Sequence, residues 1–181
     1  PALLDSFGTH LDTLMTSKDK LSKMDGAAAD LCVIENEDEF SENDIEAPAG
    51  ALFNITDQKT LYSKNANDER EIASITKIMT ALLAMKYADL SQEVTISYTP
   101  EGLESSAVLC GFEQGDKMML SSLLSAALIY SGNDAAIDIA IAVAGSQEAF
   151  VDMMNQESKE LMTSHTHFAN PTGLTQSKHY S

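Results

Sequence analysis

A serine and a lysine three positions apart, Ser74 and Lys77, stand at the start of the apolar stretch IASITKIMTALLAMKYADL. Residues i and i+3 share a helix face about 5–6 Å apart at Cβ, so the hydroxyl and the amine become neighbours in the first turn. Apolar surroundings lower the pKa of a lysine because they disfavour its charged form. A neutral amine beside a serine hydroxyl is a general base that makes the serine a nucleophile. The spacing therefore predicts an activated serine for acyl transfer.

The same spacing also arises by chance, and the chain contains a second example in Ser17 and Lys20 of TSKDKLSK. The neighbours of that pair are polar, so nothing there would desolvate the lysine. Spacing alone leaves an ordinary helix start open as the interpretation of Ser74 and Lys77.

A second polar element, Ser131-Gly132-Asn133, lies between two apolar segments that both have helical character. A short turn at this place can direct polar side chains into a cleft. Other Ser-x-Asn triplets occur at 41–43, in an acidic segment, and at 63–65, at the end of an expected strand. A simple N-cap for the next helix, made by Asn133 or Asp134, is the structural alternative.

Hydrophobic periodicity places these residues on a mixed set of strands and helices. AGALFNIT and TLYSKN, separated by DQK, predict a β-hairpin. Further helices are expected in the second half of FEQGDKMMLSSLLSAALIY, in NDAAIDIAIAVAG with Gly145 as its stop, and in SQEAFVDMMNQESKELMTSH with a serine cap. A two-stranded hairpin is marginal by itself, so more strands are expected beside it.

The helix that begins at Ser74 has an apolar stripe of its own. Its members recur at helical spacing and predict one broad apolar face; they are Ile75, Ile78, Met79, Leu82 and Leu83. This face is the one expected to pack against the core.

Size and composition fit one globular domain without a nucleic-acid or lipid partner. The chain has 181 residues, of which 44% are hydrophobic, and a formal net charge of −17. That charge disfavours a phosphate backbone and an anionic membrane, both of which attract clustered Lys and Arg. The sequence contains no apolar run of the roughly 18 residues that a membrane-spanning helix needs.

The first 46 residues differ from the rest of the chain. A short apolar helical stripe near Leu3–Leu14 is followed by ENEDEFSENDIE, from Glu35 to Glu46, which contains no basic residue. Like charges at that density repel one another, so this segment is interpreted as a solvated linker. A calcium loop would need a central glycine and an ordered ligand pattern that are both missing. The predicted organisation is an extension at 1–46 and a globular part at 47–181, and PALLDSFGTH has no signal-peptide pattern.

The cysteines and histidines do not predict a metal site. Cys32 and Cys110 match no metal or redox spacing, and two unpaired thiols are favoured over a disulfide. His165 and His167 alternate, as two ligands on one strand face would, but no third ligand cluster accompanies them. No cofactor or metal is expected.

Three segments together, ASITKIMTALLAM, YSGNDAA and HFANPTGL, resemble the serine D-alanyl-D-alanine carboxypeptidases, the low-molecular-mass penicillin-binding proteins. The resemblance covers roughly residues 49–181, about three quarters of the chain. It implies an α/β (α+β) fold of the β-lactamase/transpeptidase type, in which helices flank an antiparallel sheet and a second lobe is mostly helical.

The resemblance also implies roles for four residues. Ser74 is the nucleophile that becomes acylated, and Lys77 is its base. Ser131 relays a proton toward the leaving amine, and Asn133 binds Lys77 and the substrate amide. The implied substrate is a peptidoglycan stem peptide ending in D-Ala-D-Ala, penicillin is the implied inhibitor, and the implied location is the bacterial cell envelope outside the cytoplasm. The N–H of Ser74 would form half of an oxyanion hole.

One family element is missing, because the chain contains no Lys-Thr-Gly, Lys-Ser-Gly or His-Thr-Gly triplet. In the family that triplet lies on a strand C-terminal to the end of this chain. We therefore expect this chain to be the N-terminal portion of the domain, completed by a C-terminal remainder that supplies the other strands and that can be a separate chain. Alternative functions are a penicillin-binding or wall-binding module without turnover, and a β-lactamase or esterase on the same fold. The missing Glu-x-x-Leu-Asn motif disfavours a class A β-lactamase.

Overall fold

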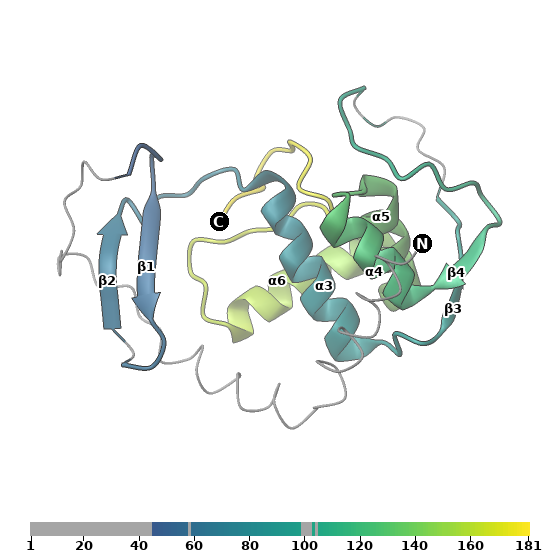
Figure 1. Cartoon of the computed structure of the whole chain (residues 1–181), viewed down its shortest axis with the longest axis horizontal. Helices are drawn as coiled ribbons and strands as arrows, with labels where there is room; N and C mark the ends of the chain where they lie inside the picture. Colours follow the sequence, from purple (N-terminus) through teal and green to yellow (C-terminus); the bar gives the residue numbers. More distant parts are fainter. Residues whose placement is uncertain (1–44, 58, 99–102, 104) are drawn as a thin grey trace. The chain divides into compact units, whose positions relative to one another are not determined.

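The computed structural model of the chain describes residues 45–57, 59–98, 103 and 105–181. The chain divides into two compact units, with the boundary between Glu69 and Arg70. A β-hairpin belongs to the first unit, and all the described helices belong to the second (Figure 1). The predicted N-terminal stripe, most of the acidic segment and Cys32 lie outside the described residues.

The hairpin consists of β1 (Gly50–Asn54) and β2 (Lys59–Lys64), which pair antiparallel with one register shift. At the end of β1 the side-chain oxygen of Asn54 accepts hydrogen bonds from the N–H groups of Thr56 and Asp57, at 3.0 and 3.1 Å. This local turn chemistry is typical of asparagine, whose side chain bonds the backbone two or three residues on. The predicted hairpin is confirmed.

The second unit contains the four predicted helices and a small sheet. The elements are η2 (Ala73–Ile75), α3 (Thr76–Tyr87), β3 (Glu93–Thr95), β4 (Lys117–Met119), α4 (Leu120–Ile129), α5 (Asn133–Ala144) and α6 (Gln147–Glu160). The antiparallel pair of β3 and β4 was not predicted, because three-residue strands are too short to show an alternating pattern.

Helices α3, α5 and α6 enclose a hydrophobic core of this unit together with the segment that follows α6. Its buried members are Leu83, Ala140, Phe150, Met154 and Phe168, none of them more than 4% exposed. Burying a large apolar side chain contributes about 1.5–3 kcal/mol. Asn155 on α6 accepts from the N–H of Phe168 and donates to its carbonyl, which fixes the start of the C-terminal segment.

The buried face of α3 differs from the predicted one. Ile75 and Ile78 are 62% and 65% exposed. The buried residues of the helix are Thr76, Lys77, Thr80, Ala81, Leu83 and Ala84. The reason is that the C-terminal segment, far away in sequence, offers carbonyl groups to this side; Thr80, for example, donates to the carbonyl of Pro171 at 2.7 Å. Polar side chains with such partners can be buried. Apolar periodicity was therefore wrong for Ile75 and Ile78, whereas Leu83 is buried as predicted and Met79 packs against the core.

Two predicted helix ends are confirmed and one is corrected. Ser146 caps α6 by accepting from the N–H of Ala149, and Gly145 ends α5 in the left-handed conformation with φ 83°. The N-cap of α5 is Gly132, with no capping side chain, so neither Asn133 nor Asp134 is the cap. Both side chains bind elsewhere, as described below.

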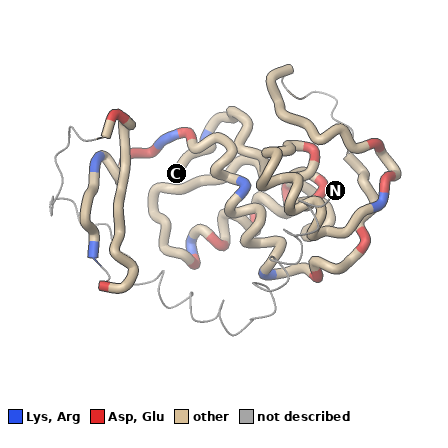
Figure 2. Tube along the Cα trace, in the orientation of Figure 1, with Lys and Arg blue, Asp and Glu red and all other residues tan. Residues whose placement is uncertain are grey.

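Acidic residues outnumber basic residues along the chain (Figure 2). One buried acid is paired across two helices. Lys86 on α3 donates to both carboxylate oxygens of Glu157 on α6, at 3.0 and 2.9 Å. This hydrogen bonding raises the pKa of Lys86 above its ordinary value. Within the part of the chain that the structure describes, no helix has the length and apolar character that crossing a bilayer requires.

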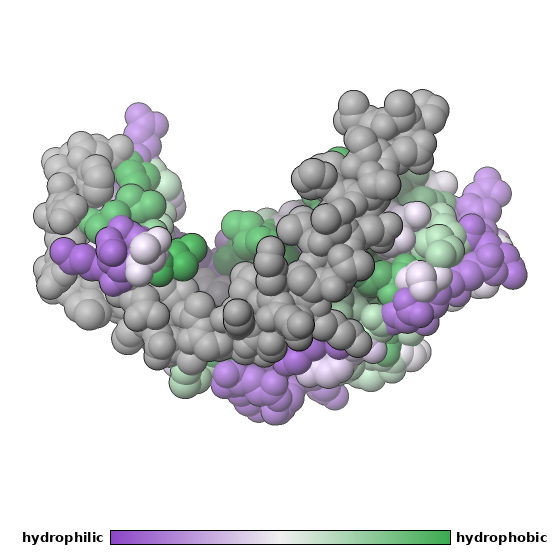
Figure 3. Space-filling model, turned by 60° about the horizontal axis from the view of Figure 1, so that its bottom comes forward, coloured by the Kyte–Doolittle hydropathy of each residue, from purple (hydrophilic) through white to green (hydrophobic). Residues whose placement is uncertain are grey.

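Large apolar side chains remain on the surface of both units (Figure 3). Leu52 and Ile55 of the hairpin unit are 47% and 71% exposed. In the second unit the exposed set includes Val108, Leu109, Leu128, Ile129 and Tyr130, which flank the Ser131-Gly132-Asn133 turn in space or in sequence.

We predict that Leu83→Ala lowers the free energy of unfolding by about 2–5 kcal/mol, because Leu83 is fully buried in the core. The matched control is Ile78→Ala on the same helix, which should cost at most about 0.5 kcal/mol because Ile78 is mostly exposed. Urea denaturation followed by circular dichroism measures both variants. Equal losses would contradict the burial pattern of α3.

Candidate active site

The turn that carries Ser74 is a single 3-10 turn, η2, that leads directly into α3. Ala73 has φ 45°, a conformation that costs about 1–3 kcal/mol for a residue with a side chain. The backbone of Gly173 packs against this turn so closely that a Cβ on Gly173 would lie 1.8 Å from the carbonyl oxygen of Ala73. Only glycine allows that approach. The C-terminal segment therefore braces the strained turn, and Ser74 is left exposed.

The side chain of Lys77 is buried and surrounded by oxygen atoms. Its Nζ donates to the carbonyl of Thr172 at 2.8 Å, to Oδ1 of Asn133 at 2.9 Å and to Oγ of Ser74 at 3.3 Å. Burial lowers the pKa of Lys77 from 10.5 to about 8, and the thiol of Cys110 opposes the shift. About a tenth of the amine is thus neutral at pH 7, far more than for an ordinary lysine, within reach of the serine hydroxyl.

Ser131 lies in the turn between α4 and α5 with φ 59°, another positive value for a residue with a side chain. Its Oγ donates to Oγ of Ser74 at 2.9 Å. The predicted turn therefore does direct a polar side chain onto the serine. Ser74 contacts both Ser131 and Lys77, although 57 residues separate it from the first.

Asn133 is oriented by two hydrogen bonds to one carbonyl. Its backbone N–H and its Nδ2 both donate to the oxygen of Val108, at 2.9 and 3.0 Å. Because Nδ2 is occupied in this way, Oδ1 faces the ammonium of Lys77. This is why Asn133 is not the helix cap: its side chain is committed to the loop on one side and to the lysine on the other.

Three supporting residues were not predicted to belong to the site, and one of them, Asp134, was considered only as a helix cap. Asp134 accepts from the N–H groups of Cys110 and Gly111, which holds the loop before β4 against the start of α5. Thr172 supplies its carbonyl to Lys77, and Gly173 provides the close approach to Ala73. The adjacent acid after the Ser-Gly-Asn turn could have indicated Asp134, but a backbone carbonyl such as that of Thr172 has no residue-type signature.

Of the other residues considered in the sequence, Cys110 lies beside the site, where its thiol influences the pKa of Lys77, and His167 shares no described hydrogen bond with the four site residues. His167 pairs with Tyr180 through the backbone, and its Nδ1 bonds the carbonyl of Lys178. The other Ser-x-Asn triplet that the structure describes, 63–65, lies at the end of β2. The triplet at 41–43 and the Ser17–Lys20 pair lie outside the described residues. Cys110 carries a free thiol. In the described ranges no three His, Cys, Asp or Glu side chains are grouped as a metal site.

A sequence model of the family described as D-alanyl-D-alanine carboxypeptidase matches residues 36–181. The chain belongs to this family. The match includes all four predicted site residues and every residue that the structure describes.

Known members align over the same region. The carboxypeptidase DacF of Bacillus subtilis is 40% identical over 141 residues, which are 75% of this chain and 36% of that protein. DacC of Escherichia coli is 36% identical over 72% of this chain and 35% of its own length. The chain thus spans about a third of the curated relatives it matches.

A solved structure of a mutant Streptomyces DD-transpeptidase superposes with a TM-score of 0.71 and 29% identity, over 77% of this chain and 58% of the other. The fold is therefore that of the penicillin-binding proteins, and the predicted fold class is confirmed.

We predict that Lys77 titrates near pH 8, well below the ordinary lysine value of about 10.4, and that Lys86 titrates above that ordinary value. The reason is the loss of hydration of the buried ammonium. NMR of the chain with isotope-labelled lysine side chains measures every midpoint, and Lys77→Arg assigns the outlying resonance by removing it. Titration of every lysine above pH 10 would contradict the geometry of the site.

Proposed function

We propose that this chain carries the nucleophile, base and proton relay of a serine D-Ala-D-Ala carboxypeptidase acting on peptidoglycan stem peptides. The observation that carries the proposal is the exposed hydroxyl of Ser74, 2.9 Å from the hydroxyl of Ser131 and 3.3 Å from a buried amine whose pKa is about 8. Membership of the carboxypeptidase family supports the same chemistry.

In the proposed acylation, Oγ of Ser74 attacks the carbonyl carbon of the terminal peptide bond while Nζ of Lys77 takes its proton. The carbon–nitrogen bond then breaks, and the departing D-alanine amine receives a proton that Ser131 passes on from the protonated lysine. The products are a serine ester of the shortened peptide and free D-alanine. The N–H of Ser74 would stabilise the negative oxygen of the intermediate.

In the proposed deacylation, water attacks the ester and gives up a proton through the same lysine, which releases the peptide acid and restores Ser74. Asn133 is suited to hold the substrate amide because Val108 and Lys77 already fix the plane of its side chain. Benzylpenicillin would acylate Ser74 as a substrate mimic.

We further propose that the domain covers residues 47–181, with 1–46 as an extension, and that strands from a C-terminal remainder cover the exposed hairpin. The two-stranded β1–β2 sheet with Leu52 and Ile55 exposed supports this, because a lone hairpin is marginal in water. The remainder would also supply the Lys-Thr-Gly wall of the cleft. A substrate of this kind places the protein at the cell envelope, outside the cytoplasm.

Intact-mass spectrometry after incubation with benzylpenicillin tests the nucleophile. The protein tested is a fusion of this chain with the segment that follows the matched region in the Bacillus subtilis relative. We expect one adduct on this fusion, and no adduct when the fusion carries Ser74→Ala. Ser17→Ala is the matched control, because it removes a serine with the same spacing to a lysine, and its adduct should persist. An adduct that survives in Ser74→Ala, or none in a folded fusion, would rule out the proposal.

The pH profile of acylation tests the base. A base with a pKa of about 8 is mostly protonated below that value, so the rate should rise about tenfold per pH unit up to pH 8 and level off above it. Rapid-quench labelling of the fusion between pH 6 and 9.5 gives the profile. A flat profile would contradict the role of Lys77.

Turnover assays separate the carboxypeptidase from its alternatives. Release of D-alanine from a peptide ending in D-Ala-D-Ala, faster than hydrolysis of a cephalosporin or a simple ester, is the expected result. Acylation without any turnover would instead identify a binding module.

A further inference from the structure

His179 is a buried histidine that connects two segments of the site without touching Ser74 or Lys77 in the described hydrogen bonds. It is 5% exposed, and its ring packs edge-on against Phe168, with centroids 5.9 Å apart. Nδ1 accepts the N–H of Ala169 at 3.0 Å, and Nε2 lies 2.7 Å from Oγ1 of Thr76. Since an N–H group can only donate, Nδ1 carries no proton, and in the neutral ring Nε2–H donates to Thr76.

The contact between Nδ1 and Ala169 anchors the start of the turn that holds Lys77. Ala169 precedes Asn170, whose Oδ1 accepts from the N–H groups of Thr172 and Gly173, at 3.1 and 2.7 Å. The closed turn presents the carbonyl of Thr172 to Lys77. The position of that carbonyl therefore depends on where the turn is anchored.

The second contact lies on the helix of the nucleophile. Thr76 is the first residue of α3, between Ser74 and Lys77, and it is 1% exposed. The imidazole thus ties the turn at Ala169 to the start of α3. One neutral ring sets the spacing between the carbonyl that holds the lysine and the helix that carries it.

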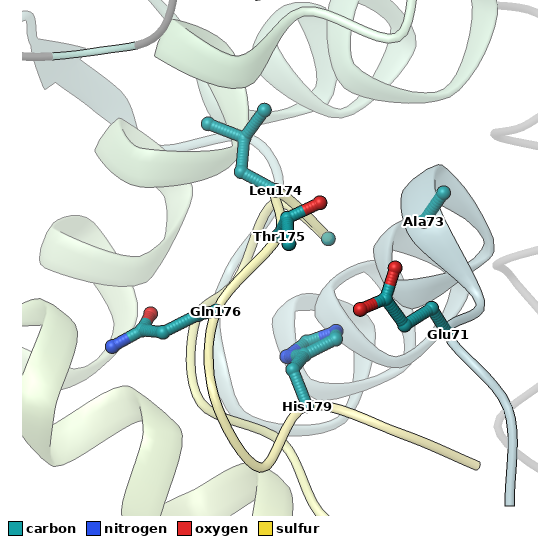
Figure 4. A pocket seen from close by; sticks show the side chains of 7 residues that line it. Glu71, Ala73, Leu174, Thr175, Gln176 and His179 are labelled. Atoms are coloured by element: carbon teal, nitrogen blue, oxygen red, sulfur yellow. The ribbon is translucent and has the colours of Figure 1, made fainter.

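The groups around the ring shift the pKa of His179. Burial lowers the pKa of His179, the nearby His167 lowers it further, and the carboxylate of Glu71 opposes the shift. Glu71 comes from the segment before η2 and His167 from the segment after α6. Figure 4 shows the Glu71 carboxylate directed toward the imidazole beside a cavity of about 30 Å³, which has room for a water molecule.

We propose that His179 is a positioning residue for the acylation reaction: its neutral ring fixes the turn that holds Lys77, and its protonation weakens that hold and slows acylation of Ser74. An imidazolium has no acceptor, so its Nδ1–H would face the N–H of Ala169 donor to donor. The turn must then move away from α3 or leave a buried donor unpaired. This inference rests on the proposed function, which it extends.

Two variants, each mimicking one ring nitrogen, separate the contacts. His179→Asn keeps an acceptor where Nδ1 was, and His179→Gln keeps a donor where Nε2 was; neither titrates. We expect His179→Asn to keep the acylation rate at pH 7.5 within about threefold of the parent, and His179→Gln to lose about tenfold, because it loses the acceptor of Ala169. Matching thermal midpoints and circular dichroism spectra identify variants that are folded. Equal rates in the two folded variants would overturn the proposal.

The pH profile gives a second readout. With both groups titrating, the slope of log rate against pH in the parent fusion should steepen from one to about two below the pKa of His179. In His179→Asn the slope should stay at one throughout. The same steepening in both proteins would assign the acidic limb to another group and overturn the proposal.

The lysine titration distinguishes failure of this inference from failure of the proposed function. In the chain by itself, His179→Gln should move the midpoint of Lys77 away from about 8, because the carbonyl of Thr172 no longer holds its ammonium in place, and His179→Asn should leave the midpoint near 8. An unchanged midpoint in His179→Gln overturns the positioning role even if Ser74 is acylated. The expected shift without acylation supports the positioning role and rejects only the carboxypeptidase function.

Discussion

The whole site depends on the burial of one ammonium group. Lys77 can lie inside the helical unit only because Thr172, Asn133 and Ser74 supply oxygen atoms to its Nζ. A buried charge without such partners would cost several kcal/mol. Those oxygens come from three places in the chain, so the fold must bring α3, α5 and the C-terminal segment together around the lysine. The same burial shifts its pKa into the range useful for a base.

The rest of the unit keeps these oxygens in place. Asn155 on α6 anchors the start of the C-terminal segment at Phe168, and Gly173 packs its backbone against Ala73. Two of the five described non-glycine residues with positive φ, Ala73 and Ser131, lie where the chemistry is expected. Such conformations persist only where surrounding contacts hold them, and at Ala73 the backbone of Gly173 provides that contact.

Much of the fold was predictable because local patterns repeat over many residues. The hairpin, the four helices, the serine cap of α6 and the glycine stop of α5 follow from periodicity and turn chemistry. The buried face of α3 did not, because its polar residues find partners about 90 residues later in the chain. The cap of α5 was also missed, since Asn133 bonds a distant loop in place of its own helix.

The sequence by itself determined the chemical types at the site: a serine and a lysine one helical turn apart, and a Ser-Gly-Asn turn between two apolar helices. Spacing alone could not distinguish these residues from the other Ser-x-x-Lys and Ser-x-Asn matches in the chain. The tertiary structure decided that Ser131 lies 2.9 Å from Ser74 and that Lys77 is buried. The physical reason is that desolvation and long-range hydrogen bonds exist only after folding, because both depend on which distant segments displace water from the lysine.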